Sequence, residues 1–214
     1  MPSTSQLLTF ALASIVLIEI PGPSLLFALG RALTVGRGDA VLSVLGNALG
    51  LLLVQVTAVA VGLGALVAAS ATAFSIVKLA GAAYVIYLGI QAIRHRADAR
   101  AKLEQVSGVR QASGLGAVRT GFAVGATNPK TIVFLLAFLP QFIDARAAAA
   151  PQILLLGVLF ATMAFGSDSL WVLLASRVKQ WFARRPARLD GLGATGGVIM
   201  IGLGVYVATS SRHS

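Results

Sequence analysis

The sequence contains few of the residues from which soluble proteins build their surfaces and active sites. Only 11% of its 214 residues are charged and 57% are hydrophobic, whereas a soluble domain carries about 25% charged residues. This composition excludes a soluble enzyme, a disordered segment and a nucleic-acid-binding domain. Cysteine is absent, and the only histidines are His95 and His213. We therefore expect no metal site, no cofactor and no nucleic-acid partner.

What the sequence has instead is long apolar segments. A helix needs about 20 mostly apolar residues to cross the hydrocarbon core of a bilayer. The segments that meet this requirement are 5–32, 40–66, 72–93, 116–143, 151–175 and 189–208. They are hydrophobic on all sides rather than alternating, which favours helices over strands. The predicted fold class is an all-α integral membrane protein with six transmembrane helices, forming a single domain over residues 1–214.

The basic residues predict an orientation in the membrane. Most Lys and Arg fall in the loops near 33–39, 94–114 and 176–188, whereas the opposite side receives only Arg146 and Arg212. Short loops rich in Lys and Arg remain in the cytoplasm. The pattern predicts a multi-pass protein in contact with lipid, with a cytoplasmic linker at 95–114 and both termini on the periplasmic side.

The two halves of the chain, 1–94 and 115–214, share a pattern. Pro21-Gly22-Pro23 interrupts the first apolar segment, and Asn128-Pro129-Lys130 interrupts the fourth. Because three helices separate equivalent positions, the second half would be inverted relative to the first. We therefore expect a 3+3 inverted repeat with proline-broken first and fourth helices, a plan in which the interruptions mark the substrate site of many transporters.

Three ionisable residues, Glu19, Lys130 and Asp168, lie near the middle of their segments. Each costs at least ~2.5 to 3.5 kcal/mol at the bilayer centre, so each needs a reason. One hypothesis is a substrate or coupling-ion site, in which the half-helices that begin after the prolines direct their N–H groups at a carboxylate. The alternative is a buried salt bridge that only fixes the packing of the helices.

Smaller polar and glycine residues add weaker indications. Asn47, together with Gln55, Thr127, Ser167 and Ser169, either contacts substrate or forms hydrogen bonds between helices. Glycines four residues apart allow close helix contact, within one chain or in a homodimer. These pairs are Gly46/Gly50, Gly121/Gly125 and Gly193/Gly197.

Several of these blocks, taken in order, resemble the lysine-exporter and homoserine/threonine-exporter (LysE/RhtB) family. They are Pro21-Gly22-Pro23 with Arg31 and Gly36-Arg37, the stretch from Lys78 to Ile90, Asn128-Pro129-Lys130 with 138–142, and Gly202-Leu203-Gly204. The resemblance implies a bacterial inner-membrane exporter of amino acids or related metabolites, energised by an ion gradient. Ser24 stands where the family commonly has Asn, at the presumed site.

The hypothesis that accommodates these features is a secondary exporter that works by alternating access and is not an enzyme. The carboxylate of a zwitterionic substrate would lie near Lys130 and the half-helix N-termini, and its ammonium near Glu19 or Asp168. Asp168 is the better candidate for the ammonium, because hydrogen bonds from its neighbours Ser167 and Ser169 would help it to remain a fixed anion. Glu19, or failing that Asp168, would exchange a proton or sodium ion. The expected substrate residues are Pro21, Gly22, Pro23, Ser24, Asn47, Asn128, Pro129, Lys130 and Asp168. A channel or structural subunit and, less favoured, an intramembrane enzyme are the alternatives.

Overall fold

The computed structural model describes residues 2–20, 22–57, 71–94, 112–144, 147–175 and 187–209, and all regular structure in these residues is helical. The first half contains α1 (Thr4–Glu19), α2 (Pro23–Thr34), α3 (Arg37–Gly50), the π-helical turn η1 (Leu51–Val56) and α5 (Ala71–Arg94). The second half contains α7 (Leu115–Ala126), α8 (Pro129–Phe138), the 3₁₀ turn η2 (Leu139–Phe142), α9 (Ala149–Leu173) and α11 (Ala187–Thr209). The prediction of an all-helical fold is confirmed for this part of the chain.

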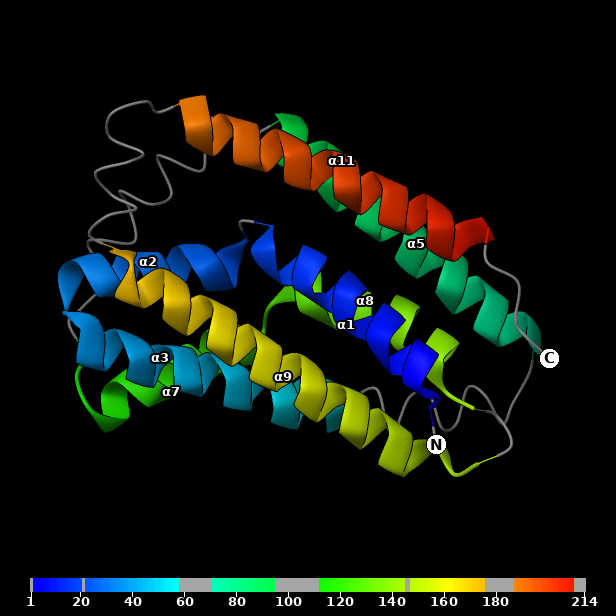
Figure 1. The fold of residues 1–214 in the computed structure, drawn as a ribbon, viewed down its shortest axis with the longest axis horizontal. Coiled ribbons are helices and arrows are strands. Elements are labelled where there is room, and N and C mark those ends of the chain that lie inside the picture. The colour runs from blue at the N-terminus through cyan, green and yellow to red at the C-terminus, as the bar shows by residue number, and fades with distance from the viewer. Residues whose placement is uncertain are drawn as a thin grey trace.

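The helices lie in two groups joined by α1 and α8 (Figure 1). α5 and α11 pack side by side along one edge of the molecule, and α3 and α7 pack side by side at the opposite edge. α9 runs across α1, α2 and α3, while α8 contacts α5 and η1. Each of the two closely packed pairs therefore takes one helix from each half of the sequence.

Glycines allow both of these pairs to approach closely. A Cβ atom on Gly46 of α3 would lie 2.0 Å from the carbonyl oxygen of Val118, and one on Gly121 of α7 would lie 1.8 Å from that of Ser43. Between α5 and α11, a Cβ atom on Gly197 would lie 2.4 Å from the carbonyl oxygen of Gly89. No side chain fits at such distances. The prediction of close helix contact is confirmed within one chain for Gly46, Gly121 and Gly197, which leaves no room for a second copy at these points. The surroundings of Gly193 lie outside what the structure describes.

Two helix pairs are bent where the sequence has proline. The axes of α1 and α2 form an angle of 57°, and those of the α7 and α8–η2 segments form an angle of 52°. Pro23 and Pro129 occupy the first helical positions of α2 and α8. Proline is well placed there, because the N–H group that it lacks would have no partner within the helix.

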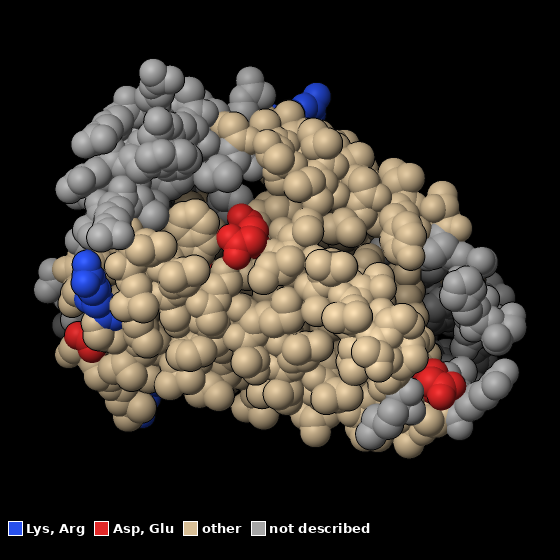
Figure 2. Space-filling model, viewed as in Figure 1, with Lys and Arg blue, Asp and Glu red and all other residues tan. Residues whose placement is uncertain are grey.

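The outer surface of the described helices is apolar. Leu12 is 68% exposed and Leu8 61%, and exposed leucine, isoleucine and valine side chains continue along α5, α9 and α11. Uncharged residues cover most of the described surface on the face that Figure 2 shows. Such an apolar surface suits contact with lipid rather than water.

The length and apolarity of the helices can be compared with the six predicted spans. Among the described residues, α9 alone is long and apolar enough to cross a membrane by itself, and the number rises to three if each bent pair forms one span. The apolar stretches Leu79–Arg94 in α5 and Ala194–Tyr206 in α11 are shorter. Residues 58–66 of the second predicted span, and most of the predicted linker, lie outside the described residues.

Candidate substrate site

A small pocket lies where the two bent helix pairs meet α9. Both polar and apolar side chains line it, from α1, α2, α3, η1, α8 and α9: Leu17, Ile18, Ser24, Leu25, Asn47, Leu51, Asn128, Lys130, Thr131, Phe160, Ala164 and Asp168. Five of the predicted substrate residues are in this set. The pocket therefore joins positions that lie up to 151 residues apart (Leu17 to Asp168).

Lys130 connects the start of α8 to the end of α1. Its Nζ atom donates hydrogen bonds of 2.9 Å to the carbonyl oxygens of Leu17 and Ile20. Carbonyls in the last turn of a helix have no partner within it, and they carry the negative end of the helix dipole. The ammonium of Lys130 donates hydrogen bonds to these carbonyls, and its positive charge complements the negative end of the dipole. The carboxylates of Asp168 and Glu19 attract it electrostatically, but its hydrogen bonds go to the main chain.

Asn128 organises the second bend. Its Oδ1 atom accepts a hydrogen bond of 3.1 Å from the main-chain N–H of Lys130, which caps the first turn of α8. Its Nδ2 atom donates to Ser24 Oγ at 2.7 Å, and Ser24 Oγ donates to Asn47 Oδ1 at 3.1 Å. This chain of side chains joins α8, α2 and α3 across the pocket.

The N-terminus of α2 borders the pocket and has no side-chain cap. Gly22 is its N-cap and provides no side-chain hydrogen bond. The first N–H groups of a helix lack partners within it, and Pro23 has none to offer. Among the described residues, no group accepts a hydrogen bond from the main-chain N–H of Ser24 or Leu25, and both residues line the pocket. Helix N-termini of this kind attract carboxylates.

Asp168 presents a carboxylate to the pocket from the unbroken helix α9. Its side chain is 3% exposed, and no hydrogen bond to its carboxylate exists among the residues that the structure describes. The expectation that Ser167 and Ser169 bond to it is wrong: Ser167 Oγ donates to Glu19, and Ser169 Oγ is buried without a partner in the described structure. A buried carboxylate without a hydrogen-bonding partner is costly.

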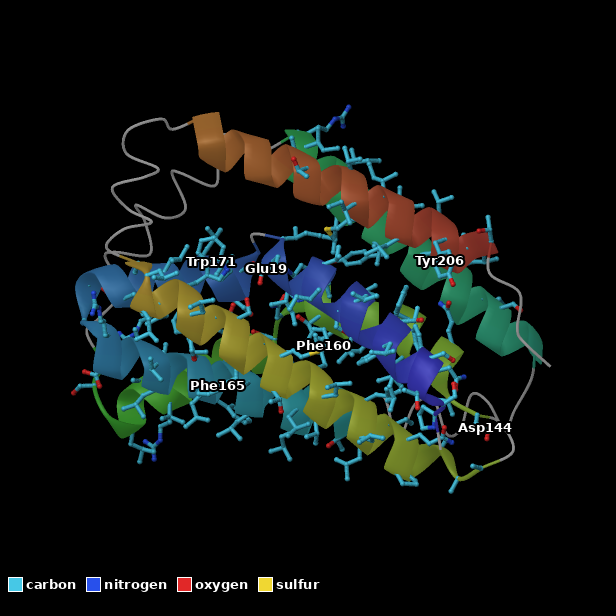
Figure 3. All side chains as sticks on the ribbon, in the orientation of Figure 1. Glu19, Asp144, Phe160, Phe165, Trp171 and Tyr206 are labelled. Atoms are coloured by element: carbon cyan, nitrogen blue, oxygen red, sulfur yellow. The ribbon has the colours of Figure 1, made fainter. Side chains whose placement is uncertain are left out.

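Glu19 lies outside the pocket. It is exposed at the end of α1 and accepts hydrogen bonds from Ser167 Oγ and, at 3.0 Å, from Trp171 Nε1. Figure 3 shows Glu19 beside the part of α9 that carries Trp171. Ser167 and Trp171 are four residues apart and share one face of α9, whereas Asp168 projects from another. One turn of α9 therefore contacts Glu19 on one side and carries Asp168 on another.

The remaining predicted substrate residues do not line the pocket. Pro23 and Pro129 are exposed at the starts of their helices. Gly22 adjoins the site, because a Cβ atom there would lie 3.1 Å from Lys130 Nζ. Pro21 and the side chain of Gln55 lie outside the described residues. The described residues contain no group of three or more His, Cys, Asp or Glu side chains that could hold a metal ion.

Three residues that line the pocket, Thr131, Phe160 and Ala164, and Trp171, which bonds to Glu19, were not predicted from the sequence. The spacing of Phe160, Ala164 and Asp168 by four residues was available in the sequence as a signal. It places all three on one face of a helix. Nothing local identified that face as the one that meets the pocket.

A second buried cation lies outside the pocket. Arg31 of α2 is 2% exposed; its Nε atom donates to Ser43 Oγ at 3.0 Å, and its guanidinium also donates to the carbonyl oxygen of Ala112. Asp39 accepts a hydrogen bond of 2.8 Å from the main-chain N–H of Gly114. These contacts hold α2 and α3 against the residues that precede α7.

Comparison with known proteins supplies independent findings. The family model described as "LysE type translocator" matches residues 15–211. A homoserine/homoserine lactone efflux protein of Salmonella typhimurium is 33% identical over 96% of each chain. A membrane protein of Vibrio cholerae is 32% identical over 95% of this chain and 96% of its own. A leucine efflux protein of Klebsiella pneumoniae is 27% identical over 94% of each chain. No solved structure matches the sequence.

Proposed function

The chain belongs to the LysE type translocator family, and from this premise we propose that it exports amino acids or related small zwitterionic metabolites across the bacterial inner membrane. The observation that carries the proposal is the pocket, which presents a cation and an open helix N-terminus together with a buried carboxylate. Relatives named for the efflux of homoserine and of leucine support the same class of substrate.

An α-amino acid complements the pocket in charge. Its carboxylate would accept hydrogen bonds from the N–H groups of Ser24 and Leu25 and would be attracted by Lys130. Its ammonium would pair with Asp168, whose carboxylate is buried and has no hydrogen-bonding partner among the described residues. Bound substrate would thereby satisfy the charged and polar groups that the described residues leave open. Ser24, Asn47 and Asn128 would hold the two helix starts in place around it.

Glu19 is the proposed coupling group, exchanging a proton or sodium ion. It lies at the end of α1, just before the bend, and its hydrogen bonds from Ser167 and Trp171 tie it to α9. Binding of a cation at Glu19 would weaken these charge-assisted bonds and change how α1 is held against α9. Because Asp168 belongs to the same turn of α9, substrate and ion would act on one structural element.

The proposed architecture is a single transmembrane domain with six spans. Each bent pair, α1–α2 and α7–α8, counts as one proline-broken span, and the halves 1–94 and 115–214 form an inverted repeat around the pocket. Residues 95–114 form a cytoplasmic linker, and both termini are periplasmic. A homodimer would use surfaces other than the α3–α7 glycines, which are buried within the chain.

The orientation can be tested without background because the sequence has no cysteine. Single cysteines at Ser3, Ala148 and Ser211 should react with an impermeant thiol reagent from the periplasmic side, and one at Ser107 should not. Labelling of Ser107 from outside would overturn the proposed topology.

Counterflow of labelled amino acids into proteoliposomes tests the proposed function. Liposomes loaded with unlabelled substrate should transiently concentrate the labelled amino acid, with saturation. Uptake that never exceeds equilibrium and never saturates would indicate a channel instead. No counterflow with any member of a panel of neutral, basic and acidic amino acids would contradict the proposal.

Two substitutions separate the roles of the acidic residues. Glu19→Gln should permit counterflow but abolish uphill export, because the exchangeable charge is gone. Asp168→Asn should raise the substrate concentration needed for half-maximal counterflow. Concentration of substrate against its gradient by Glu19→Gln would remove Glu19 from the coupling role.

A further inference from the structure

One face of α9 forms a wall of the pocket that changes along the helix from apolar at Phe160 to charged at Asp168. Phe160, Ala164 and Asp168 follow one another at intervals of four residues, and all three line the pocket. Successive positions on such a face are about 6 Å apart along the helix axis. A ligand ammonium at Asp168 would therefore lie about one turn from Ala164 and about two turns from Phe160.

The Phe160 end of the wall is apolar and well supported. The Phe160 side chain is 2% exposed, and its ring centroid lies 5.9 Å from that of Phe134. Phe134 in turn stacks on Phe138 at 4.8 Å. Leu17 and Leu51 line the same pocket from α1 and η1. Since interiors packed in this way resist rearrangement, the ring of Phe160 is a fixed boundary rather than a movable one.

The described residues that line the pocket provide no third charge. Among its lining residues only Lys130 and Asp168 are ionisable, and the proposed function assigns both to the α-carboxylate and α-ammonium of the substrate. A charged side chain would enter without a partner and would lose its hydration. An aliphatic side chain would instead contact Ala164 and reach toward Phe160.

Building on the proposed function, we propose that Ala164 and Phe160 determine specificity, so that the site takes amino acids with uncharged, mainly aliphatic side chains. The small methyl group of Ala164 leaves room for the side chain, and the ring of Phe160 limits its length. Lysine and arginine are excluded because the described lining has no second carboxylate for their charged ends.

Ala164→Val tests the first residue. The two added methyl groups should lower the ratio of leucine to alanine counterflow about tenfold, the effect that small changes of volume produce in apolar binding pockets. Ala161→Val is the matched control, since Ala161 is buried on the same helix but does not line the pocket. The control should leave the ratio unchanged. An equal loss of both substrates in Ala164→Val, or the same change of ratio in the control, would overturn the assignment.

Phe160→Leu tests the boundary with a side chain that keeps the core apolar. It should increase phenylalanine counterflow relative to leucine, because the shorter residue lengthens the pocket. An unchanged ratio in a variant that still transports leucine would remove Phe160 from the specificity role.

Counterflow by the wild-type protein distinguishes this inference from the proposed function on which it rests. Lysine counterflow as fast as leucine counterflow would contradict the uncharged-side-chain assignment while leaving amino-acid export intact. The absence of counterflow for every amino acid would contradict the proposed function itself.

Discussion

The two bent helix pairs begin their second helices in the same way, with proline at the first position, but the exposed main-chain groups are satisfied differently. At the second bend, Asn128 caps α8 with its own side chain. At the first bend, no side chain caps α2, and the carbonyls at the end of α1 are bonded by Lys130 from the second bend. The angles are nevertheless similar, 57° and 52°.

This difference indicates which bend is available to a ligand. The α8 terminus is closed by Asn128, so its first turn has less to offer a carboxylate. At the α2 terminus, no acceptor among the described residues bonds to the N–H groups of Ser24 and Leu25, which line the pocket, and Lys130 brings a positive charge beside Gly22 of the same turn. The second bend thus supplies the structural support, and the first supplies the binding surface.

Removing the shared lysine should have the largest effect. Lys130→Met removes one hydrogen bond from each of the carbonyls of Leu17 and Ile20. The Leu17 carbonyl keeps its bond from the N–H of Ile20, whereas a buried carbonyl left unsatisfied costs about 1–3 kcal/mol. The substitution also removes the cation near Asp168. We expect counterflow to be abolished. Normal export by this variant would show that the lysine does not bind substrate.

A second lysine substitution separates binding from folding. Lys130→Gln keeps a donor for the α1 carbonyls but removes the charge. It should remain monodisperse in detergent, as judged by size-exclusion chromatography, and still fail in counterflow. Full counterflow by Lys130→Gln would mean that the two main-chain hydrogen bonds, and not the charge, are what export requires.

Removing the side-chain cap of α8 at the second bend should have an intermediate effect. Asn128→Ala removes the cap of α8, which is worth about 0.5–2 kcal/mol, as well as the bond to Ser24. The thermal midpoint of unfolding should fall. Asn128→Ser retains a capping oxygen but is too short for the Ser24 contact, so it should recover most of the stability and only part of the transport. Equal midpoints for the two variants would argue against the cap.

A methyl group at the first bend should have the smallest effect. In Gly22→Ala the new Cβ atom would lie 3.1 Å from Lys130 Nζ, at the flexible end of a side chain that can shift. We expect a change in stability below about 1 kcal/mol and a modest rise in the substrate concentration for half-maximal counterflow. Gly46→Ala is the contrasting variant, since its Cβ atom would lie 2.0 Å from a main-chain oxygen. A greater loss of stability for Gly22→Ala than for Gly46→Ala would contradict the close packing of α3 against α7.

Local chemistry in the sequence predicted much of the pocket. Lys130 and Asp168 are charges within apolar segments, and Asn128 precedes proline at a helix start, so each was identifiable without a structure. The partners of these residues were not, because they depend on how the helices pack. Ser167 is adjacent to Asp168 in sequence but faces Glu19, since successive residues of a helix point in different directions.

The same reason explains the pairing of helices. The glycine pairs of α3, α7 and α11 indicated close contacts, but spacing alone does not specify which helix approaches which. Likewise, Phe160 and Ala164 are ordinary apolar residues, and only the position of α9 makes them pocket residues. Residue chemistry was readable from the sequence, whereas the assignment of faces required the fold.

The central claim is that one zwitterion binds with its ammonium at Asp168 and its carboxylate at Lys130 and the first N–H groups of α2. Competition by analogues that lack one of the two charges tests this claim. Labelled leucine counterflow would be measured in the presence of leucine, 3-methylbutylamine or 4-methylpentanoate. The first analogue lacks the carboxylate and the second lacks the ammonium. Because each leaves one of the two charged groups in the pocket without its partner, only leucine should compete effectively. Competition by either analogue as strong as that by leucine would contradict the account.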